Sequence, residues 1–337
     1  MRLSGLGRRV SLVIAAQVAA IALAASPVAC PAAWAQSEAN YPTRPIRMVV
    51  GFAAGGGNDL LARIVGQKLS ENVGQPVVIE NKTGAGGRLA VEYAQSQPAD
   101  GYTVVVGATG QLAVATAIDP KLPFHPTRTL VPLTMLASYP LVIAGPMNDA
   151  IKSVRDLIAY AKANPDKANY PTSSPVFTIT SEMFKLKTGI PGQPIPYKSS
   201  NEMMLSVVAQ QTLFAISDPS SILPLAQTGK IRALAVAGTA RLAELPDTPT
   251  MAEVGLADVD IRPQWSGGFV VAATPPAITR KLEAELRRVL ADVGVRARIR
   301  TMAYEGGGGP GEEFRQRIDT DIQVFADVIK AANLKFE

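Results

Sequence analysis

The sequence predicts an α/β protein made of two βα lobes, with mainly parallel sheets joined by hinge-crossing strands. Three observations support this fold class. The chain beyond residue 40 repeats a strand, a glycine-rich loop and a helix three times. Its strands are apolar on both faces, which is typical of a parallel sheet covered by helices. A second set of alternating strands and helices follows, and 337 residues suffice for two domains of about 100–200 residues.

Residues 1–35 have the pattern of a cleaved secretory signal. Three arginines precede an apolar run over Val10–Ala25, and Ala33–Ala35 has the small-x-small form that signal peptidase cuts after. A membrane anchor is the alternative, but the run is shorter than the roughly 20 residues that span a bilayer. Cys30 raises lipid anchoring as a further alternative, although Pro27 stands where a lipobox has leucine.

The composition excludes several classes of protein. The chain has 33 Lys+Arg and 28 Asp+Glu, and the leader holds three arginines and no acid, so the remainder carries 30 − 28 = +2. A net charge this small argues against a nucleic-acid-binding protein. The single cysteine and the single histidine, His125, exclude a disulfide framework and most His-based metal sites. Because GxSxG, SxxK, HExxH and GxxxxGK[ST] are all missing, we expect neither catalysis nor a cofactor or metal.

The three N-terminal repeats can be assigned in order. The first has a buried strand over Ile46–Phe52, a loop over Ala53–Gly57 and a helix that Asn58 caps and Gly74 ends. The two later repeats comprise strand Pro76–Glu80, loop Thr83–Gly87 and helix Arg88–Gln97, then strand Tyr102–Val106, loop Gly107–Gly110 and helix Gln111–Ile118.

The middle of the chain predicts the second set. Ser153 and Asp156 resemble a capping box that opens a helix over Val154–Ala163. The elements expected after it are helix Thr178–Lys187, strand Pro194–Tyr197, helix Asn201–Gln211, strand Leu213–Ile216, helix Ser221–Gln227 and strand Ile231–Val236. We therefore expect lobe 2 to comprise residues 141–265, and lobe 1 to comprise 36–140 and 266–337.

The C-terminal part predicts two helices. Apolar residues at helical spacing begin at Ile278, and a second such series begins at Phe314. We interpret Gly306–Gly309, between them, as a flexible break. The charges on the last helix, which include Arg315, Arg317, Asp319 and Asp321, are interpreted as a solvated face.

The glycine-rich loops predict an anion-binding site. Loops that follow parallel strands gather at one edge of the sheet, and each precedes a helix start with unpaired N–H groups. The alternative is that the glycines only make tight turns. A carboxylate suits this cradle better than a phosphate, because no lysine closes a loop as in a P-loop. The first-lobe residues expected to bind the ligand are Phe52, Ala54, Gly55, Gly56, Gly57, Asn58, Asp59, Thr83, Gly84, Ala85, Gly86, Gly87 and Thr109.

Polar residues in the second lobe supply candidates for the other side of the ligand. Ser173 and Ser174 precede one predicted helix, and Ser199 precedes another. Asp218 follows a strand and could accept from an ammonium or hydroxyl group of the ligand, or could cap the next helix. For Asp59, interaction with the helix dipole is the alternative to ligand binding.

These segments resemble a known family, the substrate-binding proteins of tripartite tricarboxylate transporters, also called the Bug family. The matching segments are Tyr41–Ile46, Phe52–Gly57 with Asp59, Ile79–Asn81 with Gly84–Gly87, Asp100–Tyr102, Asp156–Pro165, Pro196–Lys198, Gly229–Ala235 and Leu245–Thr250. Their order and spacing cover nearly all of the chain after the leader.

The resemblance implies a periplasmic binding protein of the Venus-flytrap kind. Such a protein carries a small carboxylate to a large and a small membrane subunit of a transporter, and we expect it to be a monomer that binds no nucleic acid. In the family, the loops that match Phe52–Asp59 and Gly84–Gly87 hold one ligand carboxylate, partly through ordered water. A co-receptor that presents its ligand to a membrane sensor kinase would have the same fold and pocket, so it remains the alternative.

The chain departs from the family pattern mainly in the second lobe. Ser173–Thr178 is shorter than the usual glycine- and serine-rich loop and lacks its histidine, and Ser199 replaces a common glycine. Asn58 and Thr83 also differ from the residues that are common at their positions. The distal contacts and the identity of the carboxylate therefore stay open.

Overall fold

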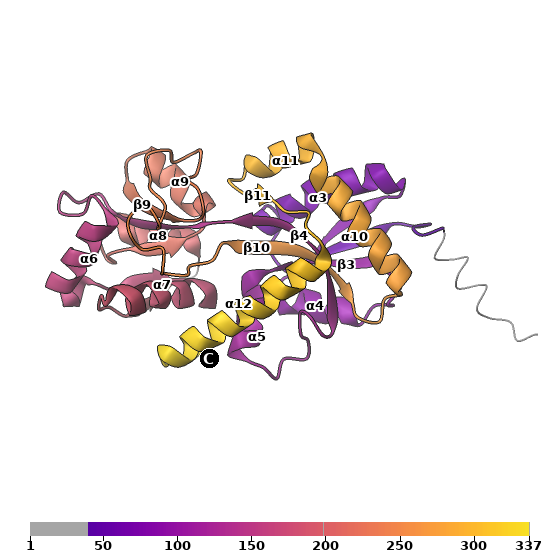
Figure 1. The fold of residues 1–337 in the computed structure, drawn as a ribbon, viewed down its shortest axis with the longest axis horizontal. Helices are drawn as coiled ribbons and strands as arrows, with labels where there is room; N and C mark the ends of the chain where they lie inside the picture. The colour runs from indigo at the N-terminus through magenta and orange to yellow at the C-terminus, as the bar shows by residue number, and fades with distance from the viewer. Residues whose placement is uncertain (1–39, 198, 337) are drawn as a thin grey trace, which may run out of the picture. The chain divides into compact units, whose positions relative to one another are not determined.

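The computed structural model describes residues 40–197 and 199–336, so the expected leader and Cys30 lie outside the described residues. Residues 1–41 and 42–337 form separate units, and the fold described below is that of the second unit. Strands and helices alternate through it, which confirms the predicted α/β class (Figure 1). No helix in the described part of the chain is both long and apolar enough to cross a bilayer.

A six-stranded sheet has the order β11-β4-β10-β3-β1-β2. Its parallel part consists of β1 (Ile46–Val50), β2 (Val77–Asn81) and β3 (Thr103–Ala108), as the three repeats predict. The remaining strands β4 (Leu130–Tyr139), β10 (Gln264–Val271) and β11 (Glu305–Gly306) pair antiparallel. Because β1, β2 and β3 are parallel, their carboxyl ends and the loops that follow them share one edge of the sheet.

Three strands that pair antiparallel form a second sheet with the order β8-β5-β9, and two others form a parallel pair. The sheet comprises β8 (Ala215–Ser217), β5 (Leu141–Pro146) and β9 (Ile231–Ala237), and the pair comprises β6 (Tyr170–Thr172) and β7 (Pro194–Pro196). Pro140 separates β4 from β5, and a proline has no N–H to give to a sheet. The chain therefore passes from one sheet to the other at this residue, as Figure 1 shows for β4.

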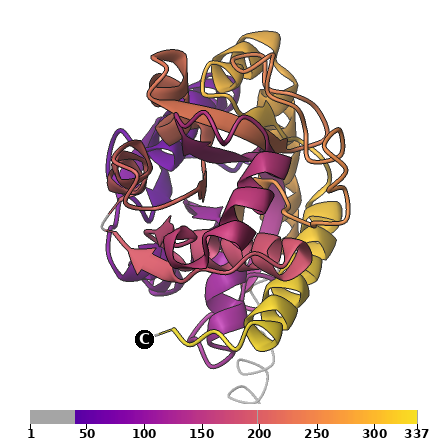
Figure 2. The same cartoon turned by 90° about the vertical axis from the view of Figure 1, so that its left-hand side faces the viewer.

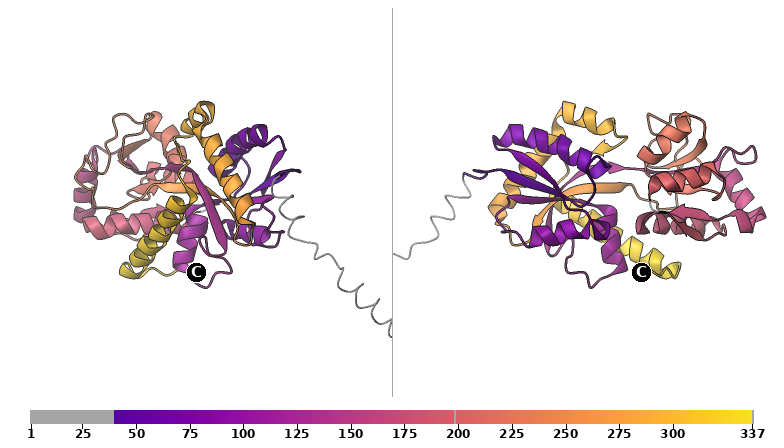
Figure 3. Two further views of the ribbon diagram at one scale, coloured as in Figure 1. Left: turned by 45° about the vertical axis from the view of Figure 1, so that its right-hand side comes forward. Right: turned by 180° about the vertical axis from the view of Figure 1, so that it is seen from behind.

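The helices divide between the two sheets (Figures 1 and 3). The six-stranded sheet carries α3 (Gly57–Val73), α4 (Arg88–Gln95), α10 (Pro276–Ala291) and α11 (Val293–Arg300). Around the second sheet lie α6 (Val154–Ala163), α7 (Pro175–Thr188), α8 (Ser200–Val208) and α9 (Pro219–Gln227). After β3 come a π-helical turn over Gly110–Val114 and α5 (Ala115–Ile118). The last helix, α12 (Gly311–Ala331), packs on β4 and also contacts α7 (Figure 2).

Several predicted boundaries need correction. The N-cap of α3 is Gly56 rather than Asn58, and no side chain caps this helix. Helix α7 begins at Pro175, three residues before the predicted start, because proline is well tolerated in the first turn. The predicted elements included neither β10 nor α11.

One hydrophobic core continues through both sheets. It contains Val105 of β3, Leu130 of β4, Ile143 of β5 and Phe184 of α7, all buried. Helix α12 contributes Phe314, whose ring meets that of Trp265 edge-on, with the ring centroids 5.0 Å apart. The two sheets are therefore joined by packing as well as by the chain segments that cross between them.

The interpretation of the α12 charges as a solvated face is wrong for Asp321. This side chain is 1% exposed and accepts hydrogen bonds from Arg317 Nε at 2.8 Å and from Trp265 Nε1 at 2.9 Å. Arg262 Nη1 lies 3.1 Å from its other oxygen. A buried carboxylate needs such partners, and here they connect α12 to β10 and to the segment that enters it.

The interpretation of Gly306–Gly309 as a flexible break is also wrong. The amide of Gly307 donates to the Leu136 carbonyl at 3.0 Å, so the segment continues the pairing of β11 with β4. A methyl group on Gly307 would come within 2.0 Å of the Met135 carbonyl oxygen. Glycine is required here because the two backbones approach closely.

Candidate functional site

The three glycine-rich loops lie at the carboxyl edge of β1, β2 and β3. The first spans residues 51–56 and leads into α3, and the second spans residues 82–84 and leads through a 3₁₀ turn, Ala85–Gly87, into α4. The third is the single residue Thr109 before the π-helical turn. The structure therefore brings together the first-lobe residues that were predicted from the sequence. Those that are exposed include Ala54, Gly55, Gly56, Thr83, Gly84 and Ala85.

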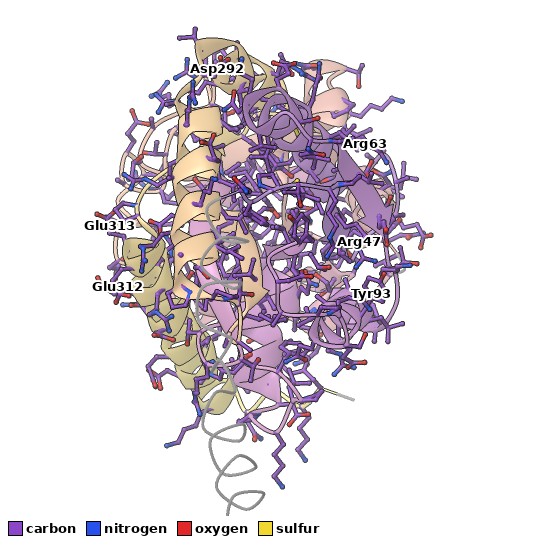
Figure 4. The ribbon with its side chains drawn as sticks, turned by 90° about the vertical axis from the view of Figure 1, so that its right-hand side faces the viewer. Arg47, Arg63, Tyr93, Asp292, Glu312 and Glu313 are labelled. Atoms are coloured by element: carbon purple, nitrogen blue, oxygen red, sulfur yellow. The ribbon has the colours of Figure 1, made fainter. Side chains whose placement is uncertain are left out.

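Asp59 organises the first loop. Its buried carboxylate accepts from the Gly55 amide at 2.8 Å, from Arg63 Nε at 2.9 Å and from Asn81 Nδ2 at 3.0 Å. The same Asn81 nitrogen donates to the Phe52 carbonyl at 2.9 Å. Arg63 approaches from the outer side of α3, where Figure 4 labels it. Asp59 thus holds the first loop to α3 and to the end of β2.

The hydrogen bond from Arg63 lowers the pKa of Asp59 to about 2, with help from the Gly55 and Asn81 donors and against the effect of burial. The carboxylate is therefore ionised at neutral pH. The Gly55 amide is occupied by it, and the Gly56 amide donates to the Ala53 carbonyl at 3.3 Å. The donors left for a ligand are the first-turn amides of α3, beginning with Gly57, which have no acceptor within their own helix.

Gln111 joins the second loop to the third. Its buried side chain donates to the Gly87 carbonyl at 2.7 Å and accepts from the Ala108 amide at 3.3 Å. Gly84, Gly86 and Gly87 all have positive φ, a conformation that glycine adopts without strain. The first loop approaches here as well, because a methyl on Gly51 would come within 2.6 Å of the Gly87 carbonyl oxygen.

Two polar candidates hold the site to β10. The buried Thr109 hydroxyl accepts from the Trp265 amide at 2.7 Å and donates to the carbonyl of the same residue at 3.2 Å. The Asn58 side-chain oxygen accepts from the hydroxyl of Ser266. The Thr109 proton is therefore engaged within the protein, whereas the Asn58 amide nitrogen can still donate.

Tyr304 adjoins the start of α3 and stacks on Tyr139, and neither tyrosine was predicted as a site residue. Their rings stack with centroids 4.3 Å apart and planes inclined by 17°. Tyr139 is the last residue of β4, and Tyr304 directly precedes β11. Glu305 pairs with Ser138, so continuing this antiparallel register by one residue places Tyr304 opposite Tyr139. The Tyr304 hydroxyl reaches Gly57, where an added methyl would lie 2.5 Å from it.

Asp218 lies at the end of β8, on the second sheet. It caps α9 by accepting from the Ser221 amide at 3.2 Å, which was one of its two predicted roles. The register of β8 on β5 pairs Ser217 with Val142, so Asp218 lies near Leu141, two residues beyond Tyr139. Burial raises the pKa of Tyr139 and of Tyr304, and the negative charge of Asp218 raises both further.

The serine candidates differ in their surroundings. Ser199 caps α8 by accepting from the Glu202 amide at 3.2 Å. Ser174 is the N-cap residue of α7, but its hydroxyl oxygen is buried without a hydrogen-bond partner among the described residues. Ser173, which is half-buried, comes directly before it. The first turn of α7 adjoins the third loop, because a methyl on Gly110 would lie 3.8 Å from Val176.

Within residues 40–197 and 199–336, no group of three or more His, Cys, Asp or Glu side chains could hold a metal ion. His125, the only histidine of the chain, accepts from the Thr127 amide at 3.2 Å through Nδ1. Burial lowers the pKa of His125, so its imidazole is neutral at pH 7. The neutral ring can accept the hydrogen bond from Thr127 that stabilises the loop around these residues.

Comparisons with known proteins agree on one family. Residues 61–334 match the model described as "Tripartite tricarboxylate transporter family receptor". BugT of Bordetella pertussis is 30% identical over 307 residues, which cover 89% of this chain and 93% of that protein.

Solved structures show the same fold. A Rhodopseudomonas palustris protein with adipate is 30% identical, with a TM-score of 0.76 over 87% of this chain and 98% of that one. MatC from the same organism, with bound malate, is 26% identical, with a TM-score of 0.73 over 86% of this chain and all of that one (100%).

Proposed function

The chain belongs to the tripartite tricarboxylate transporter receptors, the family that contains the Bug proteins, and on that basis we propose that it captures a small carboxylate in the periplasm. Members of this family are substrate-binding receptors of the periplasmic-binding-protein fold and not enzymes. We further propose that this chain has no catalytic activity and delivers its ligand to the two membrane subunits of a transporter.

The observation that carries the proposal is the free first turn of α3 among loops that are fixed in place. Gly57 begins a helix of 17 residues, whose N-terminus carries unpaired amides and about half a positive charge. Asp59, Asn81 and Gln111 hold the first and second loops around it. A carboxylate can then bind to N–H groups that need no rearrangement, and binding costs less when the site is preorganised.

The proposed distal contacts come from residues that follow the β6–β7 pair and strand β8 of the second sheet. Ser174 has a buried hydroxyl that a ligand could engage, and Ser199 keeps its own proton for donation while it caps α8. Asp218 is proposed to accept from a hydroxyl or ammonium group of the ligand, in addition to capping α9. These contacts come from residues 141–265, and the first-turn amides come from residues 36–140. We therefore propose that the two parts act as lobes that close around the ligand.

Isothermal titration calorimetry tests the proposal. The purified protein would be titrated with succinate, malate, adipate and citrate, and with glucose, putrescine and magnesium chloride as non-carboxylate probes. We expect at least one carboxylate to bind with micromolar or better affinity, and none of the other probes to bind. Binding only to the sugar, the amine or the metal would contradict the proposal.

A variant of the first turn locates the site. Gly57→Pro is made in a Tyr304→Phe background and compared with Tyr304→Phe alone, because a Cβ at residue 57 would lie 2.5 Å from the Tyr304 hydroxyl. The proline removes one first-turn amide while leaving the backbone able to start a helix, since proline is favoured at that position. We expect carboxylate affinity to fall about tenfold, as for the loss of one hydrogen bond to a charged group. Gly229→Ala strains the left-handed backbone of a glycine that follows α9 (φ 67°), so it is the control for a general loss of stability without the loss of a first-turn amide.

A further inference from the structure

The first turn of α3 has a donor beside it that is not a backbone amide. The Tyr304 hydroxyl lies against Gly57, and the Tyr304 side chain is only 7% exposed. No residue in the described part of the chain hydrogen-bonds to this hydroxyl. The hydroxyl oxygen is not among the buried side-chain atoms that lack a hydrogen-bond partner, so it is accessible from outside the protein and is available to donate to a ligand.

The ring of Tyr304 is held where it is. It stacks on Tyr139 at a centroid distance of 4.3 Å, and the strand that follows it pairs with β4 through Glu305 and Gly306. Phenol rings have few rotatable bonds, and a stacked ring has few alternatives to its position. The hydroxyl is therefore preorganised at the helix start.

Tyr304 also keeps its proton. Burial and the charge of Asp218 both raise its pKa, so the hydroxyl is neutral wherever a carboxylate ligand is ionised. It can donate to the ligand without bringing a positive charge. Asp218 brings a negative charge to the same region, since it lies near Leu141 in the register of β8 on β5 and affects both tyrosines.

We propose that Tyr304 is a ligand-binding residue whose hydroxyl donates to the carboxylate held at the first turn of α3, and that Asp218 restricts this end of the ligand to one carboxylate. This inference rests on the proposed function. A linear dicarboxylate satisfies it, because its second carboxylate lies away from Asp218. A ligand with two neighbouring carboxylates would place a second negative charge near Asp218 and be repelled.

Tyr304→Phe tests the first part by calorimetry with adipate. The substitution keeps the ring and its stacking and removes only the oxygen. We expect affinity for adipate to fall about tenfold, as for a hydrogen bond to a charged group, with the melting temperature of the ligand-free protein unchanged. Tyr160→Phe, at a half-buried tyrosine of α6, is the matched control and should bind as the wild type does.

The outcomes separate this inference from the proposed function. If the wild type binds no carboxylate, the proposed function is wrong. If the wild type binds adipate and Tyr304→Phe binds it within twofold, the role of Tyr304 is wrong and the proposed function stands.

Asp218→Asn tests the second part. Asparagine caps helices as well as aspartate does, so α9 should keep its N-terminus. We expect the wild type to bind adipate more tightly than citrate. In the variant, the ratio of the Kd for citrate to the Kd for adipate should be at least threefold smaller than in the wild type. Asp292→Asn is the matched control, because Asp292 caps α11 by accepting from the Val295 amide at 3.0 Å and lies elsewhere on the molecule (Figure 4). An unchanged preference in Asp218→Asn, or tighter wild-type binding of citrate than of adipate, would overturn the role of Asp218.

Discussion

At the scale of single residues, a buried charge shapes the first loop. Asp59 accepts from Arg63, Asn81 and the Gly55 amide. The sequence suggested either a ligand contact or an interaction with the helix dipole. Neither suggestion includes the cross-loop contact with Asn81, because 22 residues separate the two side chains in the chain.

The depressed pKa of Asp59 makes a prediction about stability and pH. The ionised form is favoured in the folded state, so its contribution is fully present above the unfolded pKa of about 3.9 and is lost as the pH falls towards 2. We expect Asp59→Asn to lower the free energy of unfolding by about 2 kcal/mol at pH 7. The difference from the wild type should shrink between pH 4 and pH 2.

Urea unfolding at pH 7, 4 and 2.5 measures this effect. Glu71→Gln, which alters an exposed carboxylate on the same helix, is the control and should change stability by less than about 0.5 kcal/mol. A difference between Asp59→Asn and the wild type that stays constant down to pH 2.5 would show that ionisation of Asp59 is not its cause.

At the scale of elements, α12 is attached through Asp321. This carboxylate lies on a helix whose charges looked solvated from spacing alone, since spacing shows which face a residue lies on but not what covers that face. Arg262 and Trp265, which contact it, come from a crossing segment far away in the sequence.

Replacing Asp321 should therefore destabilise the protein. Asp321→Ala removes the acceptor for two arginines and for the indole N–H, and breaking a buried ion pair typically costs about 3 kcal/mol or more. Thermal and urea unfolding would measure the loss. Asp327→Ala, at an exposed position of the same helix, should cost less than about 0.5 kcal/mol, and equal losses in the two variants would contradict this assignment.

The glycines before α12 provide a second prediction at this scale. Gly307→Ala puts a methyl within 2.0 Å of the Met135 carbonyl oxygen, so the segment must separate from β4. We expect a loss of about 2 kcal/mol in stability together with weaker carboxylate binding, since Tyr304 precedes this segment.

The neighbouring position is a matched control. A methyl on Gly306 would have its nearest neighbour at 3.6 Å, which is ordinary contact, so Gly306→Ala should leave both unfolding and ligand affinity close to those of the wild type. If Gly307→Ala also unfolds and binds like the wild type, the close approach to β4 does not hold that segment.

At the scale of the whole described unit, the core runs without interruption from β3 through β5 to α7. We therefore expect one cooperative unfolding transition rather than two, with the calorimetric enthalpy equal to the van't Hoff enthalpy. Differential scanning calorimetry of the ligand-free protein tests this. Two resolved peaks would show that the two sheets unfold independently.

The sequence predicted the architecture of this unit better than it predicted the contacts in the site. The repeats of strand, glycine loop and helix gave the parallel strands and the shared edge, because periodicity and glycine placement are local signals. Strand β10 and the tyrosine pair were not predicted. Tyr139 and Tyr304 meet only because β11 pairs with β4, and no local pattern shows that pairing.

The contact between Gly57 and Tyr304 has a consequence for anyone who redesigns this receptor. Gly57 cannot be enlarged while Tyr304 stays in place, since a Cβ at residue 57 would lie 2.5 Å from the phenol oxygen. A mutant library that varies residues 57 and 304 one at a time would therefore miss pairs of substitutions that fold only when they are made together. Randomising both codons together is the way to reach receptors with altered cargo.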